Sequence, residues 1–314
     1  MKVIALGVHV VDVLARPIEA IPEGQGGALV EEIRVTAAGS AGGTAITLAK
    51  LGAETFSAGA IGTDALGDVL LGLLARDGID TSLLIRREGV QTSASVLPIR
   101  ADGSRPAFHV IGANGTYTSE DAPWEAIKTA THLHLGAPEF MGGEQAAKIL
   151  AFAKQHGVVT SADLLAPGEQ ASAILEWIAP AFPHLDYLLP NDDQVLGLSG
   201  ATDLVAGCQA LLERGIGCVV ATCGGDGAVI VDGDGAEWVP AFAIEVVDTT
   251  GCGDAFSAGF LRGLSLERNR RDAAMLGCAA AALVAQGLGS DHGAFDLADA
   301  DAFAAATALA GVHA

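Results

Sequence analysis

The stretch from Asp248 to Phe256 contains the residues whose types and spacing can do chemistry, and it reads Asp-Thr-Thr-Gly-Cys-Gly-Asp-Ala-Phe. Two glycines bracket one small residue, an aspartate follows at once, and an apolar helical pattern begins. Such a turn directs the backbone N–H groups of Gly251, Cys252 and Gly253 into one concavity at the N-terminus of a helix. Free donors and the helix dipole favour an anion there. The sequence therefore predicts an anion site at this turn.

Asp254 places a carboxylate beside that anion site, where Coulomb repulsion disfavours it. A base next to a bound phosphate is understandable if a hydroxyl group must lose its proton while it attacks the phosphate. The alternative is a tight strand-to-helix turn in which Asp254 serves only to begin the helix.

The motif resembles the second signature of the ribokinase-like (pfkB) carbohydrate kinase family. This resemblance implies that Asp254 is the catalytic base and that the three preceding N–H groups stabilise the charge of the transferred phosphoryl group. It implies ATP and Mg²⁺ as cofactors and a hydroxymethyl group of a sugar or sugar-like alcohol as acceptor. An alternative from another functional class is a ligand-binding pseudokinase. Altered residues at other positions of the family's motifs favour this alternative, and the intact Asp254 argues against it.

Short apolar, strand-like runs alternate with helical patterns along most of the chain. This alternation predicts an α/β fold with a mainly parallel central sheet covered by helices on both faces. The resemblance implies the three-layer α/β/α ribokinase-like version of it. We expect strands at residues 3–7, 55–59, 132–135, 158–162, 187–189, 218–222 and 228–231, and helices at residues 44–51, 66–76, 144–156, 203–214 and 277–288.

Two regions interrupt the alternation. Residues 13–36 and 90–112 read as extended, antiparallel material, and the second contains a hairpin turn signal at residues 101–104, Ala-Asp-Gly-Ser. We expect them to form a small β-sheet lid, and the resemblance implies that a homodimer can be joined through its exposed edges. The α/β core would then consist of residues 1–12, 37–89 and 113–314.

A glycine-rich turn at residues 38–45, Ala-Gly-Ser-Ala-Gly-Gly-Thr-Ala, lets the backbone approach a ligand closely. It resembles the family's first signature, which implies that Gly39, Gly42 and Gly43 line the substrate site. The family pattern has Gly-Gly at the first two positions and Asn at the sixth. This chain has Ala38 and Gly39 in the former and Gly43 in the latter, so one side-chain hydrogen bond to the substrate is missing.

The acceptor is defined less sharply than the reaction. Asp12 is expected to close the first strand, where an aspartate of the family accepts hydrogen bonds from two sugar hydroxyls; a strand-end cap is the alternative. True ribokinases carry a glutamate where this chain has Gly136, so ketoses, sugar acids, sugar phosphates and nucleosides all remain candidates. A nucleoside kinase would need an aromatic or apolar pocket for the base, for which Phe108, Tyr117 and Phe140 are candidates.

The nucleotide is expected along two further turns. Asn191 lies in a Pro-Asn-x-x-Gln sequence that resembles the family's Pro-Asn-x-x-Glu element near Mg²⁺. Gln194 holds the Glu position and Asp193 precedes it, and either could offer an oxygen ligand; the alternative is an ordinary helix N-terminus. Residues 222–227 resemble the family's nucleotide loop, which implies ATP contacts at Thr222, Gly224, Gly225 and Gly227.

The helix at 277–288 is expected beside the adenine. The glycines at 287 and 289 would then lie near a monovalent-cation site that also includes Asp248 and Thr250. K⁺ is the candidate ion for this site.

Composition limits the partners. The chain has 17 basic and 38 acidic residues among 314, a formal net charge of −21. This charge argues against nucleic acid and against an anionic membrane surface. The N-terminus lacks the anatomy of a signal peptide, and the alanine-rich run at 273–288 suits a packed internal helix better than a membrane span. A cytoplasmic enzyme with a small-molecule substrate is therefore expected.

Overall fold

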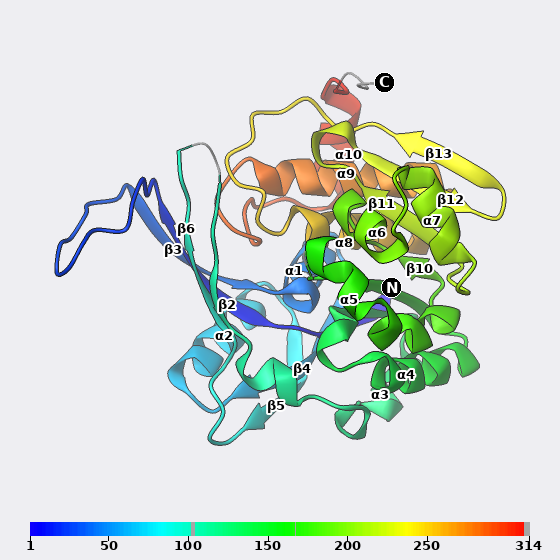
Figure 1. Ribbon diagram of the computed structural model, residues 1–314, viewed down its shortest axis with the longest axis horizontal. Coiled ribbons are helices and arrows are strands. Elements are labelled where there is room, and N and C mark those ends of the chain that lie inside the picture. Colours follow the sequence, from blue (N-terminus) through cyan, green and yellow to red (C-terminus); the bar gives the residue numbers. More distant parts are fainter. Residues whose placement is uncertain (102–103, 167, 311–314) are drawn as a thin grey trace.

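The computed structural model describes residues 1–101, 104–166 and 168–310, and it contains two separate sheets (Figure 1). The central sheet has nine strands in the order β13-β12-β11-β10-β9-β8-β1-β4-β5. They are β1 (Lys2–Gly7), β4 (Glu54–Gly62), β5 (Asp80–Arg87), β8 (His132–Gly136), β9 (Val159–Asp163), β10 (Tyr187–Leu188), β11 (Cys218–Thr222), β12 (Ala228–Asp232) and β13 (Gly235–Val239). Neighbours are parallel from β5 to β11, and β12 and β13 continue the sheet antiparallel.

Helices cover both faces of this sheet. They are α1 (Ser40–Lys50), α2 (Ala65–Arg76), α3 (Trp124–Thr129), α4 (Gly143–Gln155), α5 (Gly168–Ile178), α6 (Asp192–Ser199), α7 (Leu204–Leu212), α8 (Cys252–Ser265), α9 (Arg270–Ala285) and α10 (Leu297–Ala306). Strand β1 shows how the layers arise, because its side chains alternate between the faces. Ile4 and Leu6 pack with α3–α7, whereas Val3 and Ala5 pack with α1, α2, α8 and α9. The expected three-layer α/β/α fold is confirmed.

The second sheet has four strands in the order β3-β2-β6-β7 and lies at the left of Figure 1. They are β2 (Val10–Arg16), β3 (Glu32–Ala38), β6 (Ala94–Pro98) and β7 (Phe108–Val110). Both regions that interrupt the strand–helix alternation contribute to it. The expected antiparallel pairing is confirmed within each region, where β2 pairs with β3 and β6 pairs with β7. The two regions join through β2 and β6, which run parallel. The expected hairpin turn includes residues 102–103, which lie outside the described residues; beside it, Arg100 N–H donates to Ser104 O at 2.9 Å.

The second sheet also corrects the placement of Asp12. Strand β1 ends at Gly7, whose φ of +138° turns the chain away from the central sheet, so Asp12 does not close the first strand. It lies instead within β2, paired with Thr36 of β3 and Ser95 of β6. Because paired residues share a face, these three buried polar side chains face the core together. The division of the chain into core and lid at the stated boundaries stays a prediction.

No single helix in the described ranges is both long and apolar enough to cross a membrane. Helices α6 and α7 pass that test only as a pair bent by 61°, on length and composition alone.

Candidate active site

The glycine turn predicted to bind an anion lies at the N-terminus of α8. Gly251 precedes the helix with φ of +78°, and a Cβ atom there would lie 2.6 Å from Ser290 Cβ, so only glycine fits. Cys252 N–H donates weakly to Thr249 O at 3.3 Å, whereas the N–H groups of Gly251 and Gly253 have no acceptor among the described residues. Two of the three predicted donors are therefore free to bind an anion.

Asp254, in the first turn of α8, is directed toward α1. Its carboxylate contacts the backbone of Gly43, where an added Cβ would lie 2.9 Å from Asp254 Cγ. Thr44 Oγ1 also donates to Asp254 O at 3.4 Å. The departure from the family's first signature thus has a physical reason, since with Asp254 in this position no side chain fits at residue 43.

Two further carboxylates and one guanidinium surround Asp254. Burial of its carboxyl group raises the pKa of Asp254 well above its usual range, and the nearby charges of Asp163 and Asp12 raise it further, while Arg105 lowers it. Burial likewise raises the pKa of Asp12 to about 6. Asp163 was not predicted from the sequence, although an acid at the carboxyl end of a buried strand is a recognisable signal in parallel sheets. Arg105, which lies in the β6–β7 connection, was not predicted either.

The expected substrate turn packs against a buried histidine. Gly39 begins α1 with φ of +87°, and the backbone of Gly42 lies close to the ring of His9. His9 is fully buried, and Asn114 holds its backbone through two hydrogen bonds of 3.2 and 2.9 Å. Burial lowers the pKa of His9 to about 4, so the ring is neutral and supports the turn from behind. On the side of the second sheet, Asp12 is paired with Ser95.

A cleft of about 650 Å³ lies beside the turn. One part of its wall consists of residues expected to contact the nucleotide, namely Asn191, Thr222, Gly224, Gly225 and Gly227. Another part consists of small side chains of α9, namely Cys278, Ala281, Ala282 and Ala285. Cys252, Gly253 and Arg105 also line it. The cleft therefore extends from α9 to the N-terminus of α8. The helix expected beside the adenine is α9, and it ends at Ala285 rather than at residue 288.

The two tentative magnesium ligands lie elsewhere than expected. Gln194 Oε1 accepts a hydrogen bond from Asn191 N–H at 2.9 Å, and Gln194 Nε2 donates to Leu164 O and Ala166 O. This amide therefore closes a capping box at the start of α6, the alternative left open by the sequence. Asp193 is exposed and does not line the cleft, but its neighbour Asp192 does. A magnesium role for Gln194 or Asp193 stays a prediction that this geometry disfavours.

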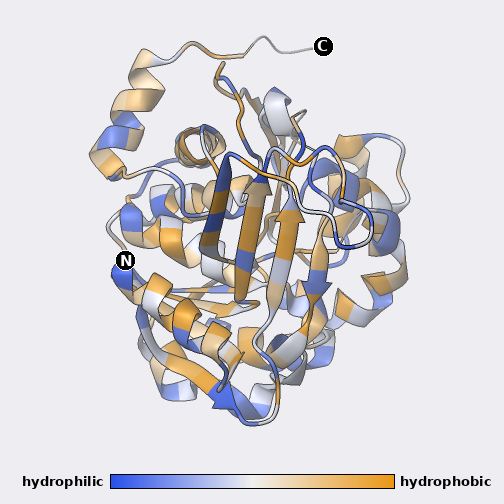
Figure 2. Cartoon of the chain, turned by 90° about the vertical axis from the view of Figure 1, so that its left-hand side faces the viewer, coloured by the Kyte–Doolittle hydropathy of each residue, from blue (hydrophilic) through white to orange (hydrophobic). Residues whose placement is uncertain are grey.

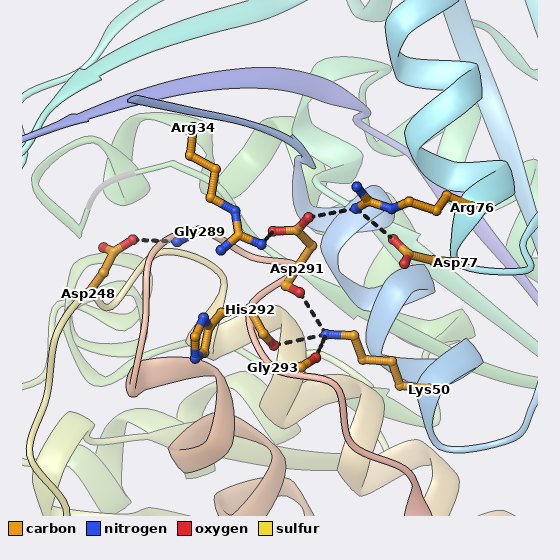
Figure 3. Close-up of polar contacts among 9 residues, drawn as sticks. All are labelled: Arg34, Lys50, Arg76, Asp77, Asp248, Gly289, Asp291, His292 and Gly293. Carbon is orange, nitrogen blue, oxygen red and sulfur yellow. Dashed lines mark hydrogen bonds and ion pairs between the residues drawn. The ribbon is translucent and has the colours of Figure 1, made fainter. Parts of the chain in front are cut away.

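Asp248 and Thr250 are brought together with Gly289, as expected. Asp248 Oδ1 accepts hydrogen bonds from Thr250 N–H at 2.9 Å and from Thr250 Oγ1 at 2.7 Å. Asp248 Oδ2 accepts one from Gly289 N–H at 2.9 Å (Figure 3). The Nε atom of Arg105 lies 3.9 Å from Asp248 Oδ1. That this pair holds K⁺ stays a prediction.

The structure places the four residues that bear on the identity of the acceptor. A Cβ atom at Gly136 would lie 2.7 Å from Ala41 Cα, so the glutamate of ribokinases does not fit beside α1. Tyr117 is buried in the core and donates its hydroxyl to Asp121 O, which removes it from any base pocket. Phe108 is paired with Val96, on the face opposite Asp12, and Phe140 packs against the cluster around Ala137.

Comparison with known proteins places these features in a family. The model of the pfkB family of carbohydrate kinases matches residues 4–295. An uncharacterised sugar kinase of Archaeoglobus fulgidus is 28% identical over 78% of this chain and 97% of its own length. A nucleoside kinase of Methanothermobacter thermautotrophicus is also 28% identical, over 78% of this chain and 77% of its own. An Escherichia coli structure provisionally named ribokinase II, in complex with ATP and Mg²⁺, has a TM-score of 0.83 at 23% identity, covering 96% of this chain and 98% of that one.

Proposed function

We propose, because the chain belongs to the pfkB family of carbohydrate kinases, that it transfers the γ-phosphate of ATP to a hydroxymethyl group of a sugar or sugar-like alcohol. One observation carries this proposal. Asp254 lies in the first turn of α8, beside two free N–H groups, with a cleft on one side and the glycine turn of α1 on the other. A base and an anion site therefore meet beside a cleft at one helix terminus.

The chemistry assigned to Asp254 is general-base catalysis. The carboxylate takes the proton of the acceptor hydroxyl as its oxygen attacks the phosphorus of the transferred group. Its raised pKa makes it a stronger base than an ordinary aspartate. The N–H groups of Gly251 and Gly253 stabilise the negative charge that develops on the phosphoryl oxygens.

The nucleotide is assigned to the cleft. The small side chains of α9 leave room for a flat adenine ring, and Gly224 and Gly225 let the phosphates lie against the backbone. Bound Mg²⁺ would supply neutralisation of phosphate charge. Asp192 and Asn191 are oxygen-bearing side chains at the cleft, which fits an ion that keeps several waters and takes few protein ligands.

The acceptor is assigned a place beside Asp254, Asp12 and the turn of α1. Asp12 comes from β2 and Arg105 from the β6–β7 connection, so the second sheet contributes groups of both charges. We assign to this sheet the role of a lid that excludes water and so suppresses hydrolysis of ATP. A nucleoside acceptor is the second candidate, because the nucleoside kinase matches the chain at the same identity as the sugar kinase.

The outer face of the second sheet supports a homodimer. Register places Val13, Val35, Val96 and Phe108 on one face, and Phe108 is 61% exposed. Figure 2 shows hydrophobic segments alternating with hydrophilic ones along the strands of this sheet, as expected for a sheet with two different faces. Contiguous apolar surface of this kind usually marks an interface, and an identical face on a second copy would cover it.

The test is release of ADP from ATP and Mg²⁺ across a panel of pentoses, hexoses, ketoses, sugar acids, sugar phosphates and nucleosides. With the acceptor found, Asp254→Asn should lower kcat by about 10²- to 10⁴-fold. Asp272→Asn is the matched control, because Asp272 occupies the first turn of α9 and does not line the cleft; it should leave kcat unchanged. If the protein is folded and binds ATP but releases no ADP with any acceptor of the panel, the result would favour a pseudokinase.

A further inference from the structure

Lys50, the last residue of α1, places its ammonium group among three consecutive carbonyl oxygens (Figure 3). Its Nζ atom donates to Asp291 O and His292 O at 2.8 Å and to Gly293 O at 2.7 Å. These carbonyls belong to the loop between α9 and α10. The ammonium also lies 4.9 Å from the centre of the Phe295 ring, a favourable cation–π distance. The loop therefore surrounds a single positive charge supplied by another element.

The same loop is fastened by its one buried carboxylate. Asp291 Oδ1 pairs with Arg34 of β3 at 2.9 Å, and Asp291 Oδ2 pairs with Arg76 of α2 at 3.0 Å (Figure 3). The Asp291 side chain is only 3% exposed, whereas the side chains of Arg34 and Arg76 reach it from the surface and are 31% and 59% exposed. The loop thus has fixed contacts with α1, α2 and the second sheet at a single residue and its neighbours.

The loop in turn supports the anion turn. Gly289 N–H donates to Asp248 Oδ2 at 2.9 Å, and Ser290 packs so closely on Gly251 that no Cβ fits between them. Residues 248 and 251 begin and end the segment that leads into α8. A shift of the loop would therefore be passed to the N–H groups at the start of α8.

We propose that the Lys50 ammonium is a built-in monovalent cation that holds residues 289–293 in place and thereby positions the Gly251 turn for phosphoryl transfer. Rings of backbone carbonyls bind monovalent ions by replacing their hydration shell, and an ammonium group has the charge and approximate size of K⁺. A covalently attached cation needs no ion from solution at this place. Lys50 is a positioning residue, since it does not line the cleft, and the proposal rests on the kinase function proposed above.

The test compares wild type with Lys50→Met, in which a side chain of similar length carries no charge. Activity is measured at constant ionic strength in tetramethylammonium chloride, and then with NH₄Cl or KCl in its place. The variant is compared with wild type in each salt, because K⁺ bound at Asp248 and Thr250 would change kcat of both proteins alike. Lys50→Met should lose about 10- to 100-fold in kcat, with a smaller change in KM, because a misplaced catalytic group costs rate. NH₄⁺ should restore much of the loss by entering the vacated carbonyl cradle.

Lys154→Met is the matched control. Lys154 also lies in the last turn of a helix, α4, but its ammonium pairs with the Asp186 carboxylate at 2.8 Å on the surface. It should show neither the loss nor the rescue. Lys50→Arg tests shape, because a planar guanidinium cannot converge on three carbonyls as an ammonium does. Partial activity without response to NH₄⁺ is expected for it.

Hydrogen exchange gives a readout that needs no turnover. Amides of residues 247–251 and 286–293 should exchange faster in Lys50→Met than in wild type and slow again in NH₄Cl. The proposal is overturned if Lys50→Met keeps wild-type kcat, or if its loss is not restored by NH₄⁺ or K⁺ while the protein stays folded. If wild type phosphorylates no acceptor, the kinase proposal fails instead, and exchange alone decides whether Lys50 holds the loop.

Discussion

Asp254 is held where its own charge is unfavourable. Its carboxyl group is shielded from water and lies near Asp163 and Asp12, and both effects raise the pKa of Asp254 in the folded protein. A raised pKa makes the carboxylate a stronger base toward a hydroxyl proton, but the buried charge lowers the stability of the folded protein. A variant that keeps the shape of the side chain but cannot ionise separates these two effects.

Asp254→Asn should therefore be more stable than wild type at neutral pH, although its kcat is expected to be much lower. Below the unfolded-state pKa, near 3.8, both proteins carry a neutral side chain at residue 254 and should have similar free energies of unfolding. Above it, unfolded wild type loses a proton that the folded state retains, which destabilises wild type by up to about 1.4 kcal/mol per pH unit until the raised folded pKa is passed. Urea unfolding across pH measures the difference, and a difference that stays constant with pH would contradict the assignment.

At the scale of elements, the contact between β8 and the start of α1 sets where the substrate turn lies. Gly136 ends β8, and its Cα faces Ala41 and Ser40 without space for a side chain. The N–H groups of Ala41 and Gly42 both donate to Val8 O, which places α1 over the end of β1. The glycine at 136 is thus explained by packing, whichever acceptor the protein uses.

Gly136→Ala should push α1 away from β8. The cost is expected at about 1–3 kcal/mol of stability, the usual range for overpacking, and KM for the acceptor should rise because Gly42 and Gly43 move with the helix. Gly72→Ala in α2 is the control, since nothing lies within 4 Å of its added Cβ and alanine favours an exposed helix interior. Thermal unfolding and acceptor saturation curves of both variants decide it; an unchanged KM in a destabilised Gly136→Ala would separate packing from substrate placement.

Elements with local signals could be predicted and those defined by distant contacts could not. Continuous apolar runs identified the buried strands, and the Asn-x-x-Gln spacing at Asn191 already allowed a helix start. Strand β5 was missed, because its edge position permits the polar sequence Asp-Thr-Ser-Leu-Leu-Ile-Arg-Arg. Asp12 was misplaced because residues 8–13 are apolar enough to prolong β1, and only the geometry at Gly7 ends it. Arg105 reaches the site through a connection between strands that no local pattern could place.

At the scale of the whole molecule, the second sheet and the anion turn meet at one loop. Arg34 of β3 pairs with Asp291, and Thr36 of the same strand packs on Gly289, which donates to Asp248. The sheet also brings Asp12 toward Asp254. Its position relative to the core therefore bears on the acceptor and phosphoryl ends of the site together, so anything that braces the sheet should influence catalysis.

The proposed second copy of the chain would brace the sheet, and its contact should depend on the outer face of this sheet. Phe108→Asp places a charge on that face, on the edge strand β7, and should convert a dimer to a monomer, because an unpaired buried carboxylate is unfavourable. Trp238→Glu, at an exposed aromatic on β13, is the control and should leave the mass of the assembly unchanged. Sedimentation at micromolar concentration measures both. If wild type sediments as a monomer, or Phe108→Asp as a dimer, the face serves another purpose, whereas dissociation accompanied by a rise in acceptor KM would show that pairing holds the sheet over the site.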